Sequence, residues 1–250
     1  MNRALKLFRL ALSSLTMIPI RFGPGEVTVA DLAASRHAFL AVGLAIGLMM
    51  AALSLTLDRL GAPGPVAAVV LVAALAILSG GLHLDGLADT FDGLFLGGDR
   101  TRRLAAMRDP HVGSFGVSAL VLTLLGKFAA LEFLHGRTRA LAILGACAVG
   151  RALILIPAGL SRYARPDGTG RVVIEAASPA DAHLAFALVL LCAVGSCGSA
   201  GFVAGLATLG LAWGLTHLAN RNLGGVTGDV LGALVELGEV VFLTTLTLHA

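Results

Sequence analysis

Long apolar stretches separated by short polar segments run through the chain from about residue 37 to its end. A helix needs about 20 mostly apolar residues to cross a bilayer, and seven stretches reach or approach that length. They are residues 37–57, 65–84, 116–134, 140–160, 183–199, 201–219 and 229–249. The pattern predicts an all-α polytopic membrane bundle of about six to seven transmembrane helices, organised as a single integral membrane domain over residues 1–250.

Two segments depart from this simple pattern. The stretches 183–199 and 201–219 are separated only by GSCGSAG, which predicts a tight hairpin. Residues 1–20 begin basic and apolar, but they lack a convincing signal-peptide cleavage site and are interrupted by Pro19. We expect them to form an interfacial or re-entrant helix that precedes the bundle.

The composition favours a membrane protein over a soluble domain or a nucleic-acid-binding protein. Hydrophobic residues make up 57% of the chain and charged residues 13%, against roughly 25% charged residues in soluble domains. The net charge of +3 is too mild to indicate nucleic-acid binding. The composition therefore predicts the lipid bilayer as a partner, with a homo-oligomer left open.

The distribution of basic residues predicts the orientation. If the N-terminus is cytoplasmic and seven spans alternate, thirteen of the 18 Lys and Arg residues fall on the cytoplasmic side and three on the other. The other two, Lys127 and Arg151, fall inside spans, where cations usually face a polar partner. The positive-inside rule then places the acidic stretches DGLADTFDG and GGVTGD together on the cytoplasmic side.

An acidic cluster ends the second apolar stretch, in HLDGLADTFDG (residues 83–93). In a helix, Asp85, Asp89 and Asp92 share one face, because they are spaced i, i+4 and i+7. Carboxylates gathered in this way repel one another unless a cation neutralises them, and Mg²⁺ is commonly held by carboxylates together with substrate phosphates. A solvated acidic helix end is the alternative. His83 could bind the metal, act as a base or make a structural hydrogen bond.

A basic segment and a glycine-rich segment supply further candidates. Arg102, Arg103 and Arg108 follow the acids, and they fit either phosphate recognition or positive-inside topology. In GGVTGDVLGALVELGE, the backbone of Gly224 and Gly225 could turn toward an anion or form a plain turn. Asp229 could cap a helix or join a site, whereas Glu236 deeper in this span needs a facing partner or a cation.

Acids, a divalent metal and arginines at a membrane surface together suit phosphoryl transfer. DTFDG resembles the opening of the CDP-alcohol phosphatidyltransferase motif, but the continuation LFLGG departs from that motif and its later half is absent. A lipid enzyme of that type is therefore an alternative. A divalent cation transporter is another, although the adjacent arginines would compete with a transported cation.

Four longer stretches resemble the cobalamin (5′-phosphate) synthase, or adenosylcobinamide-GDP ribazoletransferase, family. They are LTMIPI, GGLHLDGLADTFDG at 80–93, RRLAAMRDPHVGSFG at 102–116 and GGVTGDVLGALVELGE at 224–239, in the order of the family. The resemblance spans nearly the whole chain, and YARPDGTGR at 163–171 is similar to a further family segment.

The resemblance implies a Mg²⁺-dependent transferase of the cell inner membrane, with its active site facing the cytoplasm. In this family, a hydroxyl of α-ribazole or of its 5′-phosphate attacks the cobinamide-linked phosphate of adenosylcobinamide-GDP, and GMP leaves. We hypothesise that metal ligands, catalytic groups and substrate-binding groups divide as follows. The metal ligands would be Asp85, Asp89, Asp92, Asp229 and Glu236; the catalytic groups Asp92, Asp229 and His83; and the substrate-binding groups Arg102, Arg103, Arg108, Arg151, Gly224 and Gly225.

Overall fold

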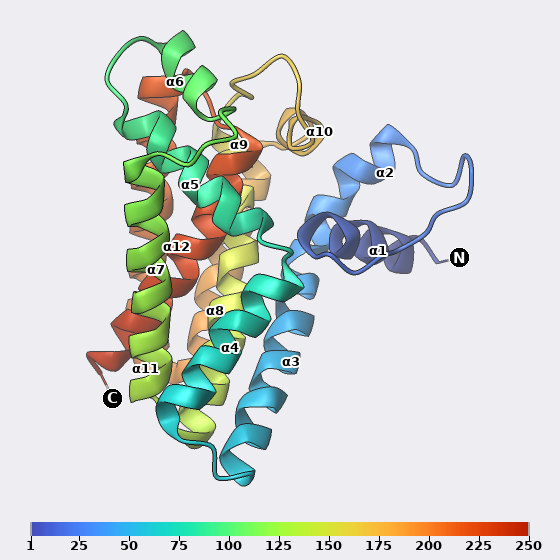
Figure 1. Cartoon of the computed structure of the whole chain (residues 1–250). Coiled ribbons are helices and arrows are strands. Elements are labelled where there is room, and N and C mark those ends of the chain that lie inside the picture. The colour runs from blue at the N-terminus through green and yellow to red at the C-terminus, as the bar shows by residue number, and fades with distance from the viewer. Residues whose placement is uncertain (1, 250) are drawn as a thin grey trace.

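The computed structural model describes residues 2–249, which fold into helices joined by short connections (Figure 1). Within these residues, the β-structure is limited to an isolated bridge between Tyr163 and Val226. The elements are α1 (Arg3–Leu15), α2 (Val29–Ala34), a 3₁₀ helix η1 (Ser35–Ala38), α3 (Phe39–Arg59), α4 (Gly64–Leu78), α5 (Leu82–Phe95), α6 (Arg100–Ala106), α7 (Ser114–Phe133), α8 (Gly136–Leu153), α9 (Leu155–Leu160), α10 (Arg171–Glu175), α11 (Pro179–Leu223) and α12 (Gly228–Thr247).

The long helices confirm the expected membrane bundle. Five helical segments of the described chain are long and apolar enough to cross a membrane, or six if the bent pair α4–α5 is one span. The 45-residue α11 is one of these segments, but its backbone leaves helical geometry at Cys197 and Gly198. A Cβ placed on Gly201 would lie 1.9 Å from the carbonyl oxygen of Ala193, so the two arms fold back on each other.

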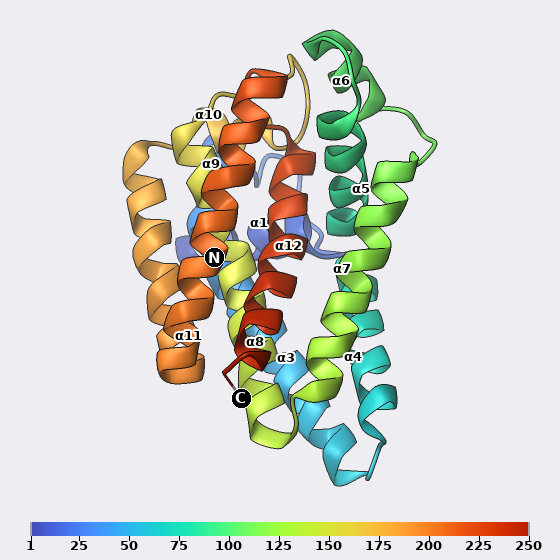
Figure 2. The ribbon, with the colours of Figure 1, turned by 90° about the vertical axis from the view of Figure 1, so that its left-hand side faces the viewer.

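Figure 2 shows these two arms of α11 side by side, running in opposite directions. The hairpin expected at GSCGSAG is therefore present, and counting its arms separately gives six segments, or seven with the bent pair. Gly198 makes the reversal possible because its φ of +59° lies in the left-handed region.

The centre of the bundle is α8, which packs against α3, α11 and α12. Its middle reads GACAVG, and small residues let neighbouring helices approach closely in a membrane. Gly43 and Gly47 of α3 complement it, because a Cβ on either would lie within 2.9 Å of a carbonyl oxygen of α8. Small residues thus let α3 and α8 approach closely, while large side chains such as Ile143 and Leu153 also belong to the core.

The second apolar stretch is not one straight helix. It is bent by 86° between α4 and α5, at Gly80 and Gly81, which both have positive φ. The sequence expectation of one continuous segment over 65–84 was wrong at this point, because Gly80 and Gly81 adopt left-handed backbone angles that turn the chain inside the apolar run. As a consequence, the acidic residues lie on a separate helix with its own direction.

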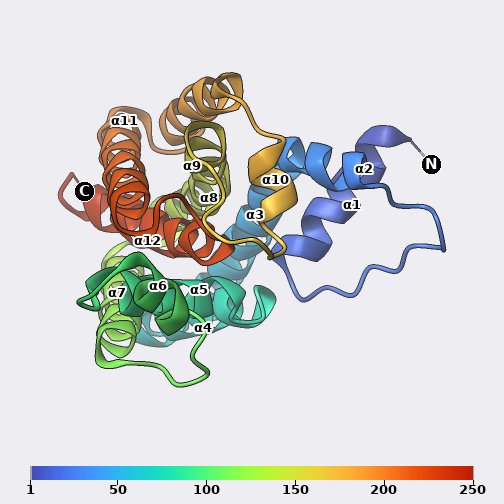
Figure 3. The ribbon, with the colours of Figure 1, turned by 90° about the horizontal axis from the view of Figure 1, so that it is seen from above.

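The two ends of the bundle differ in their loops. Figure 1 shows α6, α10 and the beginning of α12 near one end, and the α3–α4 turn at the other. The basic loops around α6 and between α9 and α10 therefore share one end of the molecule, as the charge count predicts. Figure 3, which looks onto that end, shows α1 and α2 beside the bundle, next to α3.

The N-terminal helix α1 lies across the long axis of the bundle instead of along it (Figure 1). It buries Leu10, Ala11 and Leu15, while most of its other side chains remain exposed or half-buried. This one-sided burial and crosswise orientation are those expected of an interfacial amphipathic helix.

Candidate functional site

The site is built where α5 crosses α12. A Cβ on Gly86 of α5 would lie 2.8 Å from the carbonyl oxygen of Asp229, and one on Gly232 of α12 would lie 3.3 Å from Cα of His83. The two helices can cross this closely only because neither glycine carries a side chain. The crossing brings Asp85 and Asp89 of α5 to the first turn of α12.

The carboxylates of Asp89, Asp229 and Asp85 form an acidic cluster, as the sequence predicted. Asp89 is repelled most strongly by Asp229 and then by Asp85, and Asp229 is repelled by Asp85 in turn. Asp85 is exposed, whereas Asp89 and Asp229 are half-buried. Thr227 and Arg165 bind the Asp229 carboxylate, through a hydrogen bond of 3.2 Å and an ion pair of 2.8 Å.

Arg165 is a site residue that the sequence analysis missed. Its Nη1 pairs with Asp229, while its Nε is buried and has no hydrogen-bond partner among the described residues. A buried guanidinium donor without a partner is costly, so this Nε–H is available to a substrate oxygen. The signal was YARPDGTGR, in which Arg165 sits in a loop and no spacing marks it as different from other arginines.

A basic pocket of about 440 Å³ lies beside the acidic cluster. It is lined by Arg100, Thr101, Leu104, Ala105, Arg108, Arg165 and Pro166. Arg100 also holds the loops in place, because it donates to the carbonyl oxygens of Leu223 and Ala164, both at 2.7 Å. Arg108 pairs with Asp167 in the loop opposite. Three guanidinium groups around one pocket suit the oxygens of a phosphate or diphosphate.

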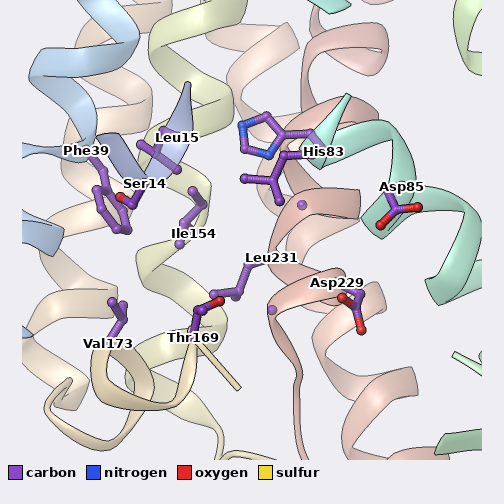
Figure 4. Close-up of a pocket in the computed structure, with 14 residues that line it drawn as sticks. Ser14, Leu15, Phe39, His83, Asp85, Ile154, Thr169, Val173, Asp229 and Leu231 are labelled. Carbon is purple, nitrogen blue, oxygen red and sulfur yellow. The ribbon is translucent and has the colours of Figure 1, made fainter. Parts of the chain in front are cut away.

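A second pocket, of about 180 Å³, opens on the other side of Asp229. His83, Asp85 and Asp229 line it, together with mainly apolar residues (Figure 4). The imidazole of His83 is only 2% exposed, and its Nε2 nitrogen lacks a hydrogen-bond partner within residues 2–249. The structural hydrogen bond that the sequence left open for this nitrogen is therefore not found.

Hydrogen bonds from two backbone amides stabilise the negative charge of Asp92. Its two carboxylate oxygens accept hydrogen bonds from the backbone N–H groups of Gly113 (2.7 Å) and Gly116 (2.9 Å). These amides lie at the N-terminus of α7, where a carboxylate is favoured by the helix dipole. A Cβ on either glycine would lie 2.4 Å from the carboxylate, so HVGSFG provides the room that Asp92 needs. Asp92 thereby joins α5 to α7.

Glu236 lies apart from the acidic cluster, about 10 Å along α12 from Asp229. It is buried and accepts a 2.6 Å bond from Nζ of Lys127, which also binds Glu239. Arg151 completes this buried quartet by pairing with Glu239. Two acids and two bases balance in charge and join α7, α8 and α12. The facing partner expected for Glu236 is thus a lysine, and the partner of Arg151 is a carboxylate.

The remaining predicted substrate-binding residues lie outside both pockets. Arg103 caps the end of α5 by donating to the carbonyl oxygens of Gly93 and Leu94. The side chain of Arg102 is exposed. Gly224 and Gly225 end α11 in a turn that packs on residues 162–164, where the carbonyl oxygen of Gly224 accepts a 2.6 Å bond from Arg162.

The donor set of the acidic cluster fits a hard cation only in part. Three carboxylates face one paired guanidinium, and oxygen ligands are those that Mg²⁺ prefers. In residues 2–249, however, no three His, Cys, Asp or Glu side chains are already arranged around one metal position. A cation bound here would therefore take further ligands from a phosphate, which the neighbouring basic pocket is suited to hold.

Comparison with known proteins identifies the family to which the chain belongs. The family model for cobalamin-5-phosphate synthase matches residues 7–247. The chain belongs to this cobalamin-5-phosphate synthase family. A relative from Klebsiella pneumoniae (strain 342), named adenosylcobinamide-GDP ribazoletransferase, is 40% identical over 246 residues, which cover 97% of this chain and 99% of the relative. A protein of the same name from Azorhizobium caulinodans is 37% identical over 249 residues, 96% of this chain and 94% of that protein.

No solved structure matches the chain. The cobalamin-5-phosphate synthase match contains all the elements that build the site, from α5 to α12. The resemblance found in the sequence is therefore confirmed over nearly the whole chain.

Proposed function

We propose that this protein transfers the cobinamide-phosphate group of adenosylcobinamide-GDP to a hydroxyl of α-ribazole or α-ribazole 5′-phosphate and releases GMP. The relatives that carry the name adenosylcobinamide-GDP ribazoletransferase support the reaction class. The observation that carries the proposal is the position of Arg165: it lines the basic pocket, pairs with Asp229 of the acidic cluster and has an Nε donor without a partner in the described part of the chain.

The reaction exchanges one phosphorus–oxygen bond for another. The acceptor hydroxyl oxygen bonds to the phosphorus that carries cobinamide, and the bond from that phosphorus to the GMP oxygen breaks with its electron pair. Arg100, Arg108 and Arg165 would hold the diphosphate oxygens and stabilise the negative charge that GMP takes away. Such transfer depends mostly on positioning and charge stabilisation.

The acceptor hydroxyl must lose its proton. Asp229 already accepts bonds from Arg165 and Thr227, whereas His83, which lines the same pocket, has no partner for its Nε2 within residues 2–249. We therefore assign proton acceptance to His83. Asp92 then acts by fixing α5 against α7, and it is a positioning residue in this scheme.

We further propose that Asp85, Asp89 and Asp229 hold Mg²⁺ together with the substrate diphosphate. The ion would neutralise phosphate oxygens in the cluster, where carboxylates and a diphosphate would otherwise repel each other. Glu236 is left out of this set because Lys127 binds it in the core of the bundle.

The protein would lie in the cell inner membrane with the site facing the cytoplasm. The basic loops gather at the end of the bundle that carries the site, and positive loops are usually cytoplasmic. The rival cation transporter is disfavoured by the core along α12, because Glu236 and Glu239 are already neutralised there by Lys127 and Arg151.

GMP release tests the proposal directly. The purified protein in liposomes should release GMP from adenosylcobinamide-GDP only when Mg²⁺ and α-ribazole, or its 5′-phosphate, are both present. A folded protein that ignores both acceptors but converts CDP-diacylglycerol with an alcohol would overturn the proposal in favour of the lipid enzyme. Metal flux without any nucleotide would favour the transporter.

A further inference from the structure

The pocket beside His83 has a chemistry unlike that of the basic pocket. Its apolar walls come from six parts of the chain and are formed by Leu15, Phe39, Leu82, Ile154, Val173 and Leu231. No lysine or arginine is among the described residues that line it. The pocket of about 180 Å³ therefore suits a flat apolar ring better than a phosphate.

Three titratable side chains belong to the lining of this pocket: His83, Asp85 and Asp229. Figure 4 shows the carboxylates of Asp85 and Asp229 near each other, whereas the imidazole of His83 points away from them, toward the apolar residue Leu15. His83 is 2% exposed and belongs to the lining, and its Nε2 has no hydrogen-bond partner among the described residues. An unsatisfied buried nitrogen of this kind is a hydrogen-bonding position for a ligand.

The N-terminal helix closes the pocket on another side. Ser14 and Leu15 of α1 belong to its lining, opposite α12 in Figure 4. The segment after α1 is fastened to the α4–α5 turn by a 3.0 Å bond from the Met17 N–H to the Leu78 carbonyl oxygen. The LTMIPI stretch thus sets the distance between α1 and the helix that carries His83 and Asp85.

We propose that this pocket is the acceptor site and that it binds the aromatic base of a nucleoside. The inference rests on the proposed function and adds the location of the second substrate. The base lies against Phe39, Ile154 and Leu231, and the sugar hydroxyl points toward His83 and the acidic cluster. The diphosphate donor approaches from the basic pocket on the other side of the Arg165–Asp229 pair, so the two substrates meet at the carboxylates.

A pair of valine variants on one short helix tests this location. Val173 of α10 lines the pocket, whereas the adjacent Val172 is half-buried and does not. Val173→Phe should fill the pocket and raise the Kd for α-ribazole at least about tenfold. Val172→Phe should leave that Kd unchanged. Both should bind adenosylcobinamide-GDP like the wild type, when each ligand is measured alone by equilibrium dialysis with protein in nanodiscs.

The outcomes separate the two proposals. Unchanged α-ribazole binding by Val173→Phe would overturn the acceptor site and leave the transferase intact. If Val173→Phe loses binding of adenosylcobinamide-GDP but keeps binding of α-ribazole, the acceptor site is also overturned, because the pocket then binds the donor. A wild type that binds neither substrate would instead contradict the proposed function. If Val173→Phe fails to fold, Thr169→Phe serves in its place, because Thr169 lines the same pocket from an exposed loop.

Discussion

The guanidinium of Arg165 lies 2.8 Å from the carboxylate of Asp229, and this ion pair stands between two pockets of opposite character. Arg165 lines the basic pocket, and Asp229 lines the pocket that holds His83. The pair therefore marks the boundary at which a phosphate held by arginines would meet a nucleophile held on the other side.

Arg165→Gln should lower kcat/KM at least about tenfold, because it removes a charge-assisted donor at the transferring phosphate. The kcat/KM of Arg165→Lys should lie between those of Arg165→Gln and the wild type, since lysine keeps the charge but lacks the planar guanidinium. Steady-state GMP release measures both. Equal activity of all three proteins would show that this arginine does not contact the reacting phosphate.

Variants of Arg108 and Arg102 test whether adenosylcobinamide-GDP binds in the basic pocket or on the exposed face of α6. Arg108→Gln should raise KM for adenosylcobinamide-GDP about tenfold by removing one phosphate-binding group from the pocket. Arg102→Gln should change it little, because that side chain is exposed and lies outside the pocket. The reverse order would support the sequence-based assignment of Arg102 to substrate binding. KM for the acceptor should not change in either variant.

Gly86→Ala should reduce activity at least about tenfold, because small displacements of reacting groups are costly. The added Cβ would lie 2.8 Å from the carbonyl oxygen of Asp229 and push α5 away from α12. Gly210→Ala is the matched control, since a Cβ there meets open space. Full activity of Gly86→Ala in a GMP-release assay would mean that the site tolerates a wider crossing.

Lys127→Met should destabilise the protein by about 3–5 kcal/mol, because it leaves two glutamates facing a single arginine in the core. Adding Glu236→Gln should restore much of the loss, since the charges then balance as Glu239 with Arg151. Unfolding in detergent, followed by circular dichroism, measures both variants. A Lys127→Met protein as stable as the wild type would contradict the structural role of the quartet.

The sequence predicted most of the fold, since apolar runs of span length have few alternatives to a transmembrane helix. It also predicted the hairpin at Gly198 and the meeting of the acidic stretches. The bend at Gly80 and Gly81 was missed: two adjacent glycines are a turn signal, but these stand inside an apolar run that was interpreted as one helix. Boundaries such as the break between α8 and α9 were hidden for the same reason.

The site was predicted less completely, because residue type and spacing do not reveal partners. The i+7 spacing places Glu236 on the Asp229 side of α12, but its partner Lys127 is 109 residues away in sequence. Asp92 carries the same charge as Asp89, and only the fold shows that the amides before α7 bind it. Arg165 was missed because one loop arginine resembles another until its contacts are known.

The account depends most on the acidic cluster, and Asp89 is the carboxylate that faces all of the others. The decisive measurement is GMP release by Asp89→Asn and wild-type protein in liposomes, with Mg²⁺, adenosylcobinamide-GDP and α-ribazole. We predict that the wild type loses activity when EDTA removes the metal, and that the variant is slower by about a hundredfold or more. Wild-type activity of a folded Asp89→Asn protein would contradict the assignment of this cluster to phosphoryl transfer.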